Sequence, residues 1–299
     1  AGGRAMVSLT NATSYFCTPC PHSLDAALVY TALPAPLELS LKMNHRRILT
    51  LARFTLLEAW RTRLPVLFTI TLALVYGAAY FFRELAITES TRVQIVFSAA
   101  ASRLAAVFVL SLYILTCVVR EFNDKGLELT LSFDLRRSQY VAGRLLGFLL
   151  IAAIMATMAG APQWLLSPHA AVLQWSVCLG LELCIVAALS LFCVMTFTHL
   201  MPAASFVAGF YLLARSLTAI QLMSNSPLAV ENPLSHQFMT WMVDGLSLVL
   251  PALDRFTQSV WLADAAAGWS TVADCAVQAL LYSSLLIAAS MFDFYRRNL

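Results

Sequence analysis

Three ionisable residues lie inside long apolar stretches of the chain, and they are its strongest candidates for chemistry within a membrane. They are Arg103, Glu182 and Arg215. A charge at mid-depth in a bilayer costs at least ~2.5–3.5 kcal/mol on insertion scales, so it rarely faces lipid. Glu182 and Arg215 fall at comparable depths in neighbouring antiparallel stretches, which predicts that they pair. Arg103 lies nearer the outer side and is expected to snorkel toward it.

The predicted Glu182–Arg215 pair has two interpretations. It could line a polar path through the membrane, or it could be a salt bridge that fixes the packing of two helices. The second interpretation is favoured, because buried ion pairs in membranes often serve packing.

The remaining reactive residue types form no catalytic or metal-binding pattern. His45, His169, His199 and His236 lie in separate segments, and neither a Gly-x-Ser-x-Gly nor a His-Glu-x-x-His motif occurs. A C-x-x-C spacing begins at Cys17, but no second ligand pair accompanies it. We therefore predict no catalytic residues and no bound metal. The ten Met and seven Cys residues are interpreted as packing rather than copper handling.

Nucleotide binding is also not expected of this chain. A phosphate-binding loop needs a Gly-x-x-x-x-Gly-Lys sequence, and neither Lys42 nor Lys125 completes one. The chain is therefore predicted to bind no cofactor of its own.

The composition is that of a membrane protein. Apolar residues make up 60% of the chain and charged residues only 12%, against roughly 25% in soluble domains. The mean hydropathy is +0.76. The net charge of +3 is too small to indicate a nucleic-acid partner.

Six stretches are long and apolar enough to cross a bilayer, which needs about 20 residues per helix. Because lipid offers no hydrogen-bond partners and no alternating barrel pattern is present, each is expected to be a helix. The predicted fold class is therefore all-α, a polytopic membrane protein. The predicted spans run from Leu64 to Phe82, Ile95 to Val119, Leu145 to Leu166, Ala171 to Thr198, Met201 to Met223 and Ala273 to Phe292.

Small residues four positions apart occur twice, once at the start of the third span and once within it. Gly143 with Gly147, and Ala156 with Gly160, form small-xxx-small pairs. Such pairs favour close packing of helices over a ligand site.

The basic residues predict the orientation. Twelve of the nineteen Lys and Arg residues lie within residues 43–63, between the second and third spans, or after the last, so this side is expected to be cytoplasmic. The segment 224–272 carries Arg255 against four acidic residues and is expected outside. Both termini are predicted to be cytoplasmic, with the protein in the bacterial inner membrane.

The N-terminal region divides into two parts. Residues 1–42 are predicted to be a disordered extension. Residues 43–63 are predicted to form an amphipathic helix on the membrane surface. Residues 43–299, which include this helix, are predicted to form one domain with six transmembrane helices. On its helical wheel Arg47, Glu58 and Arg61 lie together, Arg53 lies at the border, and Trp60 is suited to the interface. An ordinary cytoplasmic helix is the alternative. Pro65 marks a bend into the first span.

The only sizeable cytoplasmic connection covers residues 120–140. Its charges alternate with apolar residues, which favours a docking surface for a partner, although a plain connection resting on the bilayer is the alternative. The residues expected to contact a partner are Glu121, Phe122, Asp124, Lys125, Glu128, Arg136 and Arg137.

The order of these features resembles the permease subunit of ABC-2 type ABC transporters. The resemblance covers about residues 43–299 and includes Glu121, the sequence Gly-Leu-Glu-Leu-Thr-Leu from Gly126, and Gly143-Arg144 entering the next span. Phe133-Asp134 stands where the family commonly has Pro. The sequence Leu-Pro-Ala-Leu-Asp-Arg-Phe from Leu250 is similar to the branch of multicopper-enzyme or nitrous-oxide-reductase maturation permeases.

The resemblance implies a non-enzymatic half-transporter that exports an unidentified substrate. A second permease copy, most simply a homodimer, would complete the pathway. Separate ATPase subunits with ATP and Mg would bind under the loop 120–140 and the interfacial helix. The segment 233–262 would form short helices dipping into the outer leaflet. An ion-coupled secondary transporter is the alternative, and a membrane-embedded enzyme is a more distant one.

Overall fold

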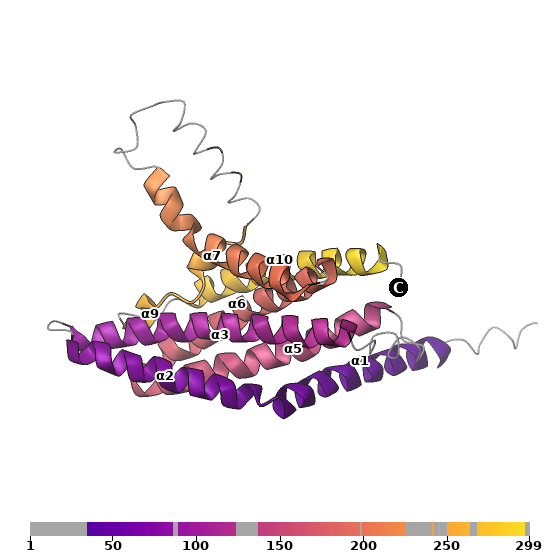
Figure 1. The fold of residues 1–299 in the computed structure, drawn as a ribbon, viewed down its shortest axis with the longest axis horizontal. Helices are drawn as coiled ribbons and strands as arrows, with labels where there is room; N and C mark the ends of the chain where they lie inside the picture. Colours follow the sequence, from indigo (N-terminus) through magenta and orange to yellow (C-terminus); the bar gives the residue numbers. More distant parts are fainter. Residues whose placement is uncertain are drawn as a thin grey trace, which may run out of the picture. The chain divides into compact units, whose positions relative to one another are not determined.

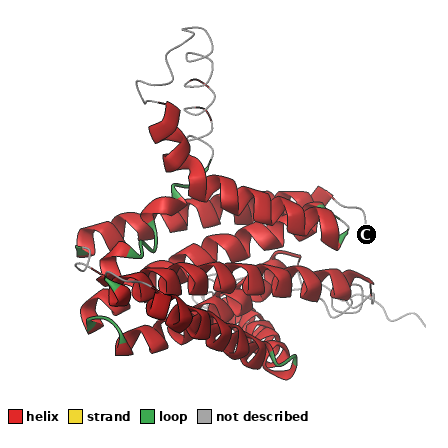
Figure 2. Ribbon diagram, turned by 60° about the vertical axis from the view of Figure 1, so that its left-hand side comes forward, coloured by secondary structure: helices red, strands yellow, loops and turns green. Residues whose placement is uncertain are grey.

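The computed structural model describes residues 35–85, 89–123, 137–197, 199–224, 241, 245, 250–263 and 268–296. Residues 44–299 form one compact unit, and residues 1–43 are assigned to another. The elements are α1 (Ala35–Arg61), α2 (Leu64–Leu85), α3 (Ser90–Asn123), α5 (Arg137–Gly160), η1 (Ala161–Leu165), α6 (His169–Thr196), α7 (Leu200–Ser224), η3 (Leu253–Arg255), α9 (Val260–Ala263) and α10 (Trp269–Arg296). Figures 1 and 2 show the described elements as helices.

The predicted fold class is confirmed. Within the described residues there is no strand, and six helices are long and apolar enough to cross a membrane. They correspond one by one to the six predicted spans. The largest boundary difference is in α5, which begins at Arg137, eight residues before Leu145. Helix α3 begins five residues before Ile95 and ends four residues after Val119.

Helix α6 forms the centre of the helical unit. It packs most extensively on α10 and α5, and also on α3 and α7. Most of α6 is buried, whereas only a small part of α10 is buried. Because α6 is apolar on every face apart from a few polar residues, burial on all sides is the arrangement its sequence favours.

The small residues of α5 allow two close helix contacts, as their spacing predicted. A Cβ atom added to Gly147 would lie 2.6 Å from the Cβ atom of Thr55 on α1, and one added to Gly143 would lie 2.7 Å from Leu51 Cδ2. At the other end, a Cβ on Gly160 would lie 2.1 Å from Ser176 Oγ on α6. Glycine is therefore needed for the approach of these helices.

Helix α1 differs in two ways from the expected surface helix. It begins at Ala35, eight residues before Met43 and within the predicted extension. It also packs on α5 through buried Ala52, Thr55 and Ala59. Its opposite side exposes four large apolar side chains, Leu49, Phe54, Leu57 and Trp60.

The bend predicted at Pro65 falls just before it. Helix α1 ends at Arg61 and α2 begins at Leu64. Arg63 has φ of 57°, a left-handed conformation that allows the sharp change of direction between the two helices.

The described part of the long segment 224–272 enters the helical unit. Residues 250–259 contain the short helix η3 and are otherwise non-helical, and their Leu253, Phe256 and Thr257 side chains are buried. Helix η3 packs against α7, and α9, which follows, packs against α3 and α6. We refer to residues 250–259 as the inserted segment.

Candidate functional site

The three charges predicted inside the spans converge on the inserted segment. Arg103 and Glu182 each lie thirteen residues after the first residue of their helix, which is about 20 Å along its axis. Both helices start on the same side of the unit, because α3 and α6 are separated by one intervening span. The two side chains therefore lie at similar depth. Together with Tyr211, Arg215 and Thr257 they form what we call the mid-span cluster.

Glu182 is the acceptor at the centre of the mid-span cluster. Its side chain is fully buried. Tyr211 donates its hydroxyl to Glu182 Oε1 at 2.9 Å, and Thr257 donates its hydroxyl to Glu182 Oε2. The carboxylate thus joins α6 to α7 and to the inserted segment.

The two arginines donate to backbone carbonyls of the same segment. Arg103 NH1 lies 2.8 Å from the carbonyl oxygen of Thr257. Arg215 NH1 donates to the carbonyl of Leu253 and lies 3.5 Å from that of Phe256. Non-helical backbone at membrane depth leaves carbonyls without helical partners, and these must be satisfied by protein groups. The arginines satisfy three of them.

The predicted Glu182–Arg215 ion pair is wrong for the described structure, in which no salt bridge joins these two side chains. The physical reason is that each has nearer partners on the inserted segment. The predicted snorkelling of Arg103 is also wrong, because its side chain is 7% exposed and directed to Thr257. The three charged side chains therefore hold the inserted segment in place and do not join two helices to each other.

Thr257 combines burial with an unusual backbone. Its φ is 29°, which is rare for a β-branched residue, and its side chain is fully buried. Such a conformation costs on the order of 1–3 kcal/mol and persists only where surrounding contacts hold it. Here the side chain bonds to Glu182 and the carbonyl accepts from Arg103.

A second polar cluster lies where α1, α3 and α5 meet, at the end of the unit from which residues 124–136 extend. Arg144 on α5 is 3% exposed. Its guanidinium donates to Glu58 Oε2 at 2.9 Å, to Glu121 Oε2, and to Thr55 Oγ1 at 3.2 Å. The thiol of Cys117 donates to Glu58 Oε1 at 3.3 Å. We call this the inner-end cluster.

Two residues of the inner-end cluster have other surroundings than the sequence predicts. Glu58, expected on the polar face of α1, is turned toward Arg144, and Glu121, expected to contact a partner, is bonded to the same arginine. The side chain of Glu121 is only 15% exposed. A buried arginine draws both carboxylates because leaving any of the three unpaired would be costly.

The other predicted partner-binding residues have varied positions. Phe122 is half-buried against the core. Asp124, Lys125, Glu128 and Arg136 lie outside the described residues, as do the side chains of Arg47 and Arg137. Arg53, Trp60 and Arg61 are exposed on α1, as expected for side chains that meet lipid or water.

Six residues of the two clusters were not predicted as site residues, namely Thr55, Glu58, Cys117, Arg144, Tyr211 and Thr257. Arg144 is among the basic residues counted between the second and third spans, although the adjacent Gly143 and Gly147 indicate that a helix packs there. Tyr211 lies four residues before Arg215, and this spacing places both on one face of α7. Nothing in the local sequence of Thr257 predicts its role.

No group of three His, Cys, Asp or Glu side chains within the described ranges could hold a metal ion. Comparison with protein-family models and with curated proteins gave no match to this chain. The fold and the two clusters define a polytopic membrane protein of a kind compatible with transport.

Proposed function

We propose that the chain is the permease subunit of an ATP-driven exporter, energised by a separate ATPase. The observation that carries the proposal is the inner-end cluster at the end of α3 from which residues 124–136 extend. Six apolar helices supply the body, and the sequence contains no phosphate-binding loop. The resemblance of residues 120–147 to ABC-2 permeases supports the same function.

In this function the inner-end cluster transmits force. Glu121 lies in the last turn of α3, directly before residues 124–136. Arg144 bonds it to α5 and, through Glu58, to α1. A pull on the loop by a closing ATPase dimer would move α1, α3 and α5 together, because a buried and charged connection resists separation.

The proposal is tested at the loop without disturbing the cluster. Asp124, Lys125 and Glu128 are replaced by Ala together, and Glu121 is left in place because its loss would uncover Arg144. We expect the variant to purify with less P-loop ATPase than the unaltered chain, while its unfolding midpoint in detergent is unchanged. Arg83→Ala is the control, because Arg83 is exposed in the last turn of α2, at the end of that helix away from α1. Retention of full ATPase co-purification, or a topology reporter that places Lys125 outside, would contradict the proposal.

A secondary transporter is the second candidate, and the mid-span cluster is what favours it. Ion-coupled carriers commonly have interrupted backbone beside ionisable residues at the bilayer midplane. The inserted segment and Glu182 have this character. Uptake or efflux in vesicles that is driven by an ion gradient without ATP, and lost in Glu182→Gln, would favour this candidate over the exporter.

A further inference from the structure

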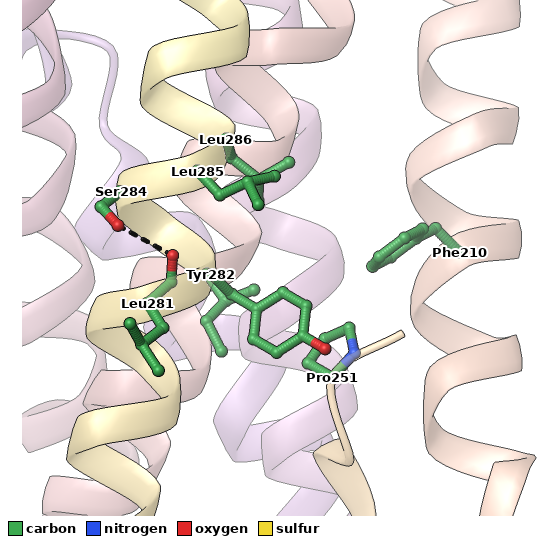
Figure 3. Close-up of a pocket in the computed structure, with 8 residues that line it drawn as sticks. Phe210, Pro251, Leu281, Tyr282, Ser284, Leu285 and Leu286 are labelled. Carbon is green, nitrogen blue, oxygen red and sulfur yellow. Dashed lines mark hydrogen bonds between the residues drawn. The ribbon is translucent and has the colours of Figure 1, made fainter. Parts of the chain in front are cut away.

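A cavity of about 630 Å³ lies between α6, α7 and α10 beside the mid-span cluster. Ile185 of α6 lines it one turn beyond Glu182, and Phe210 of α7 lines it five residues before Arg215. Figure 3 shows Phe210 facing α10 across the cavity and the Tyr282 ring directed toward Pro251. The inserted segment therefore contributes one wall through Pro251.

The lining of this cavity is apolar and carries no charge. Its polar side chains are Tyr282 and Ser284, and Ser284 donates its hydroxyl to the carbonyl of Leu281 at 2.8 Å. A water molecule in a protein cavity needs two to four polar partners, so the lining disfavours water. It also offers no counter-ion for a charged ligand. An occupant must present hydrocarbon to these walls.

The mouth of the cavity opens on the side that meets the bilayer. Leu281 and Leu285 line the cavity and are 65% and 64% exposed. Helices α7 and α10 both pack on α6. The described residues of α7 and α10 do not make extensive contact with each other. Because all three helices are long and apolar enough to span, the opening between α7 and α10 is continuous with the lipid-facing surface.

We propose that this cavity binds one acyl chain of a membrane lipid, which enters between α7 and α10. Its volume is within the range of roughly 300–1,000 Å³ that is usual for small-molecule sites. Transfer of a chain from the bilayer gains no hydrophobic free energy, since lipid tails are as apolar as Leu. The gain is the van der Waals contact made by filling a space between helices, so the site enriches one chain rather than binding it tightly.

The proposal requires only that α6, α7 and α10 lie in a bilayer, so it is independent of the proposed ATPase partner. The unaltered chain is reconstituted in phosphatidylcholine bilayers containing a fixed fraction of phosphatidylcholine with a diazirine in one acyl chain. After photolysis, the labelled residues are identified by peptide mass spectrometry. We expect adducts at Phe210 and residues 281–286, which line the cavity. Adducts at Leu74, an exposed residue of α2, report ordinary contact with lipid and serve as the reference.

A variant that fills the mouth provides the matched comparison. Leu285→Trp should lower the labelling of Phe210 about five-fold, because the indole occupies the opening. Val277→Trp, on the same helix at a residue that is 58% exposed and does not line the cavity, should leave it unchanged. If Leu285→Trp fails to fold, Phe210→Ala replaces it, and labelling of residues 281–286 relative to Leu74 should then fall because the far wall that holds the chain is gone.

Two results would overturn the proposal. Phe210 could remain unlabelled while Leu74 is labelled, or its labelling could remain unchanged when Leu285→Trp folds normally. Absence of adducts in the cavity together with a disulfide between two copies of a Leu285→Cys variant would identify the groove as an interface between copies. None of these results depends on ATPase binding.

Discussion

The inner-end cluster and the mid-span cluster each contain a buried arginine, Arg144 and Arg103, but the arginines of the two clusters bond to different kinds of partner. Arg144 meets two carboxylates, Glu58 and Glu121, each from another helix. Arg103 and Arg215 meet main-chain carbonyls of the inserted segment. In the mid-span cluster, the carboxylate of Glu182 accepts from hydroxyl groups.

This difference indicates two structural tasks. Direct ion pairs between side chains of regular helices fix how α1, α3 and α5 pack. Arginines that donate to carbonyls replace the helical hydrogen bonds that the inserted segment cannot make at membrane depth. The first cluster is therefore expected to determine global stability, and the second the local seating of one segment.

Removal of Arg144 should have the largest effect on stability. Arg144→Met leaves Glu121, which is 15% exposed, and Glu58, which is 32% exposed, without their buried partner. We therefore expect the free energy of unfolding to fall by about 3 kcal/mol, the lower end of the range for breaking a buried ion pair. The measurement is unfolding of the detergent-solubilised protein by heat and by denaturant. Arg83→Met, at an exposed position near the end of α2, should change it little.

The same cluster permits a sharper test of the ion-pair explanation. Replacing Arg144, Glu58 and Glu121 together by apolar residues of similar size removes the unpaired charges, and it should recover most of the lost stability. If the triple variant is as unstable as Arg144→Met, the loss arises from packing around the arginine stem and not from uncovered carboxylates.

Replacement of Glu182 should have a smaller and more local effect. Glu182→Ala leaves the hydroxyls of Tyr211 and Thr257 without their acceptor, which we expect to cost about 1–3 kcal/mol. The loosened segment should also expose Cys275, whose thiol contacts the carbonyl of Arg255 at 3.8 Å. The rate of Cys275 alkylation by a maleimide is therefore expected to rise, with Cys193 on the far half of α6 as the internal reference.

Tyr211→Phe and Thr257→Val separate the two hydrogen bonds of Glu182. Only Thr257→Val should raise the alkylation rate of Cys275, because Tyr211 belongs to α7 and not to the inserted segment. In a double-mutant cycle, Glu182→Ala and Thr257→Val should be strongly non-additive. Additive effects would show that Glu182 does not seat the segment.

The helical body was predictable because composition and length suffice for it. A span needs only a run of apolar residues long enough for the bilayer, and that property is local in sequence. The close packing at Gly143 and Gly147 was also predictable, since a small-xxx-small pair is a short-range pattern with a direct geometric meaning.

The partners of the intramembrane charges were not predictable for the opposite reason. Depth along a helix brought Glu182 and Arg215 to the same level, but depth says nothing about a third segment that enters between them. The acceptors are main-chain carbonyls of Leu253, Phe256 and Thr257, and every residue type has such a carbonyl. Likewise, the basic character of Arg144 indicated its side of the membrane without indicating that it is buried.

The glycines of α5 provide the smallest expected effects and the finest distinction between packing positions. At Gly147 an added Cβ meets the Cβ of Thr55, a branched residue that also bonds to Arg144, so Gly147→Ala should cost about 1–3 kcal/mol. At Gly143 the nearest atom is the end of the flexible Leu51 side chain, which rotates more cheaply, so Gly143→Ala should cost less. Gly77 and Gly209 have nothing within 4 Å of an added Cβ, and there Ala should stabilise the helix by roughly 0.5–1 kcal/mol. Equal unfolding midpoints for Gly147→Ala and Gly77→Ala would mean that α1 does not pack on α5 as closely as the inner-end cluster requires.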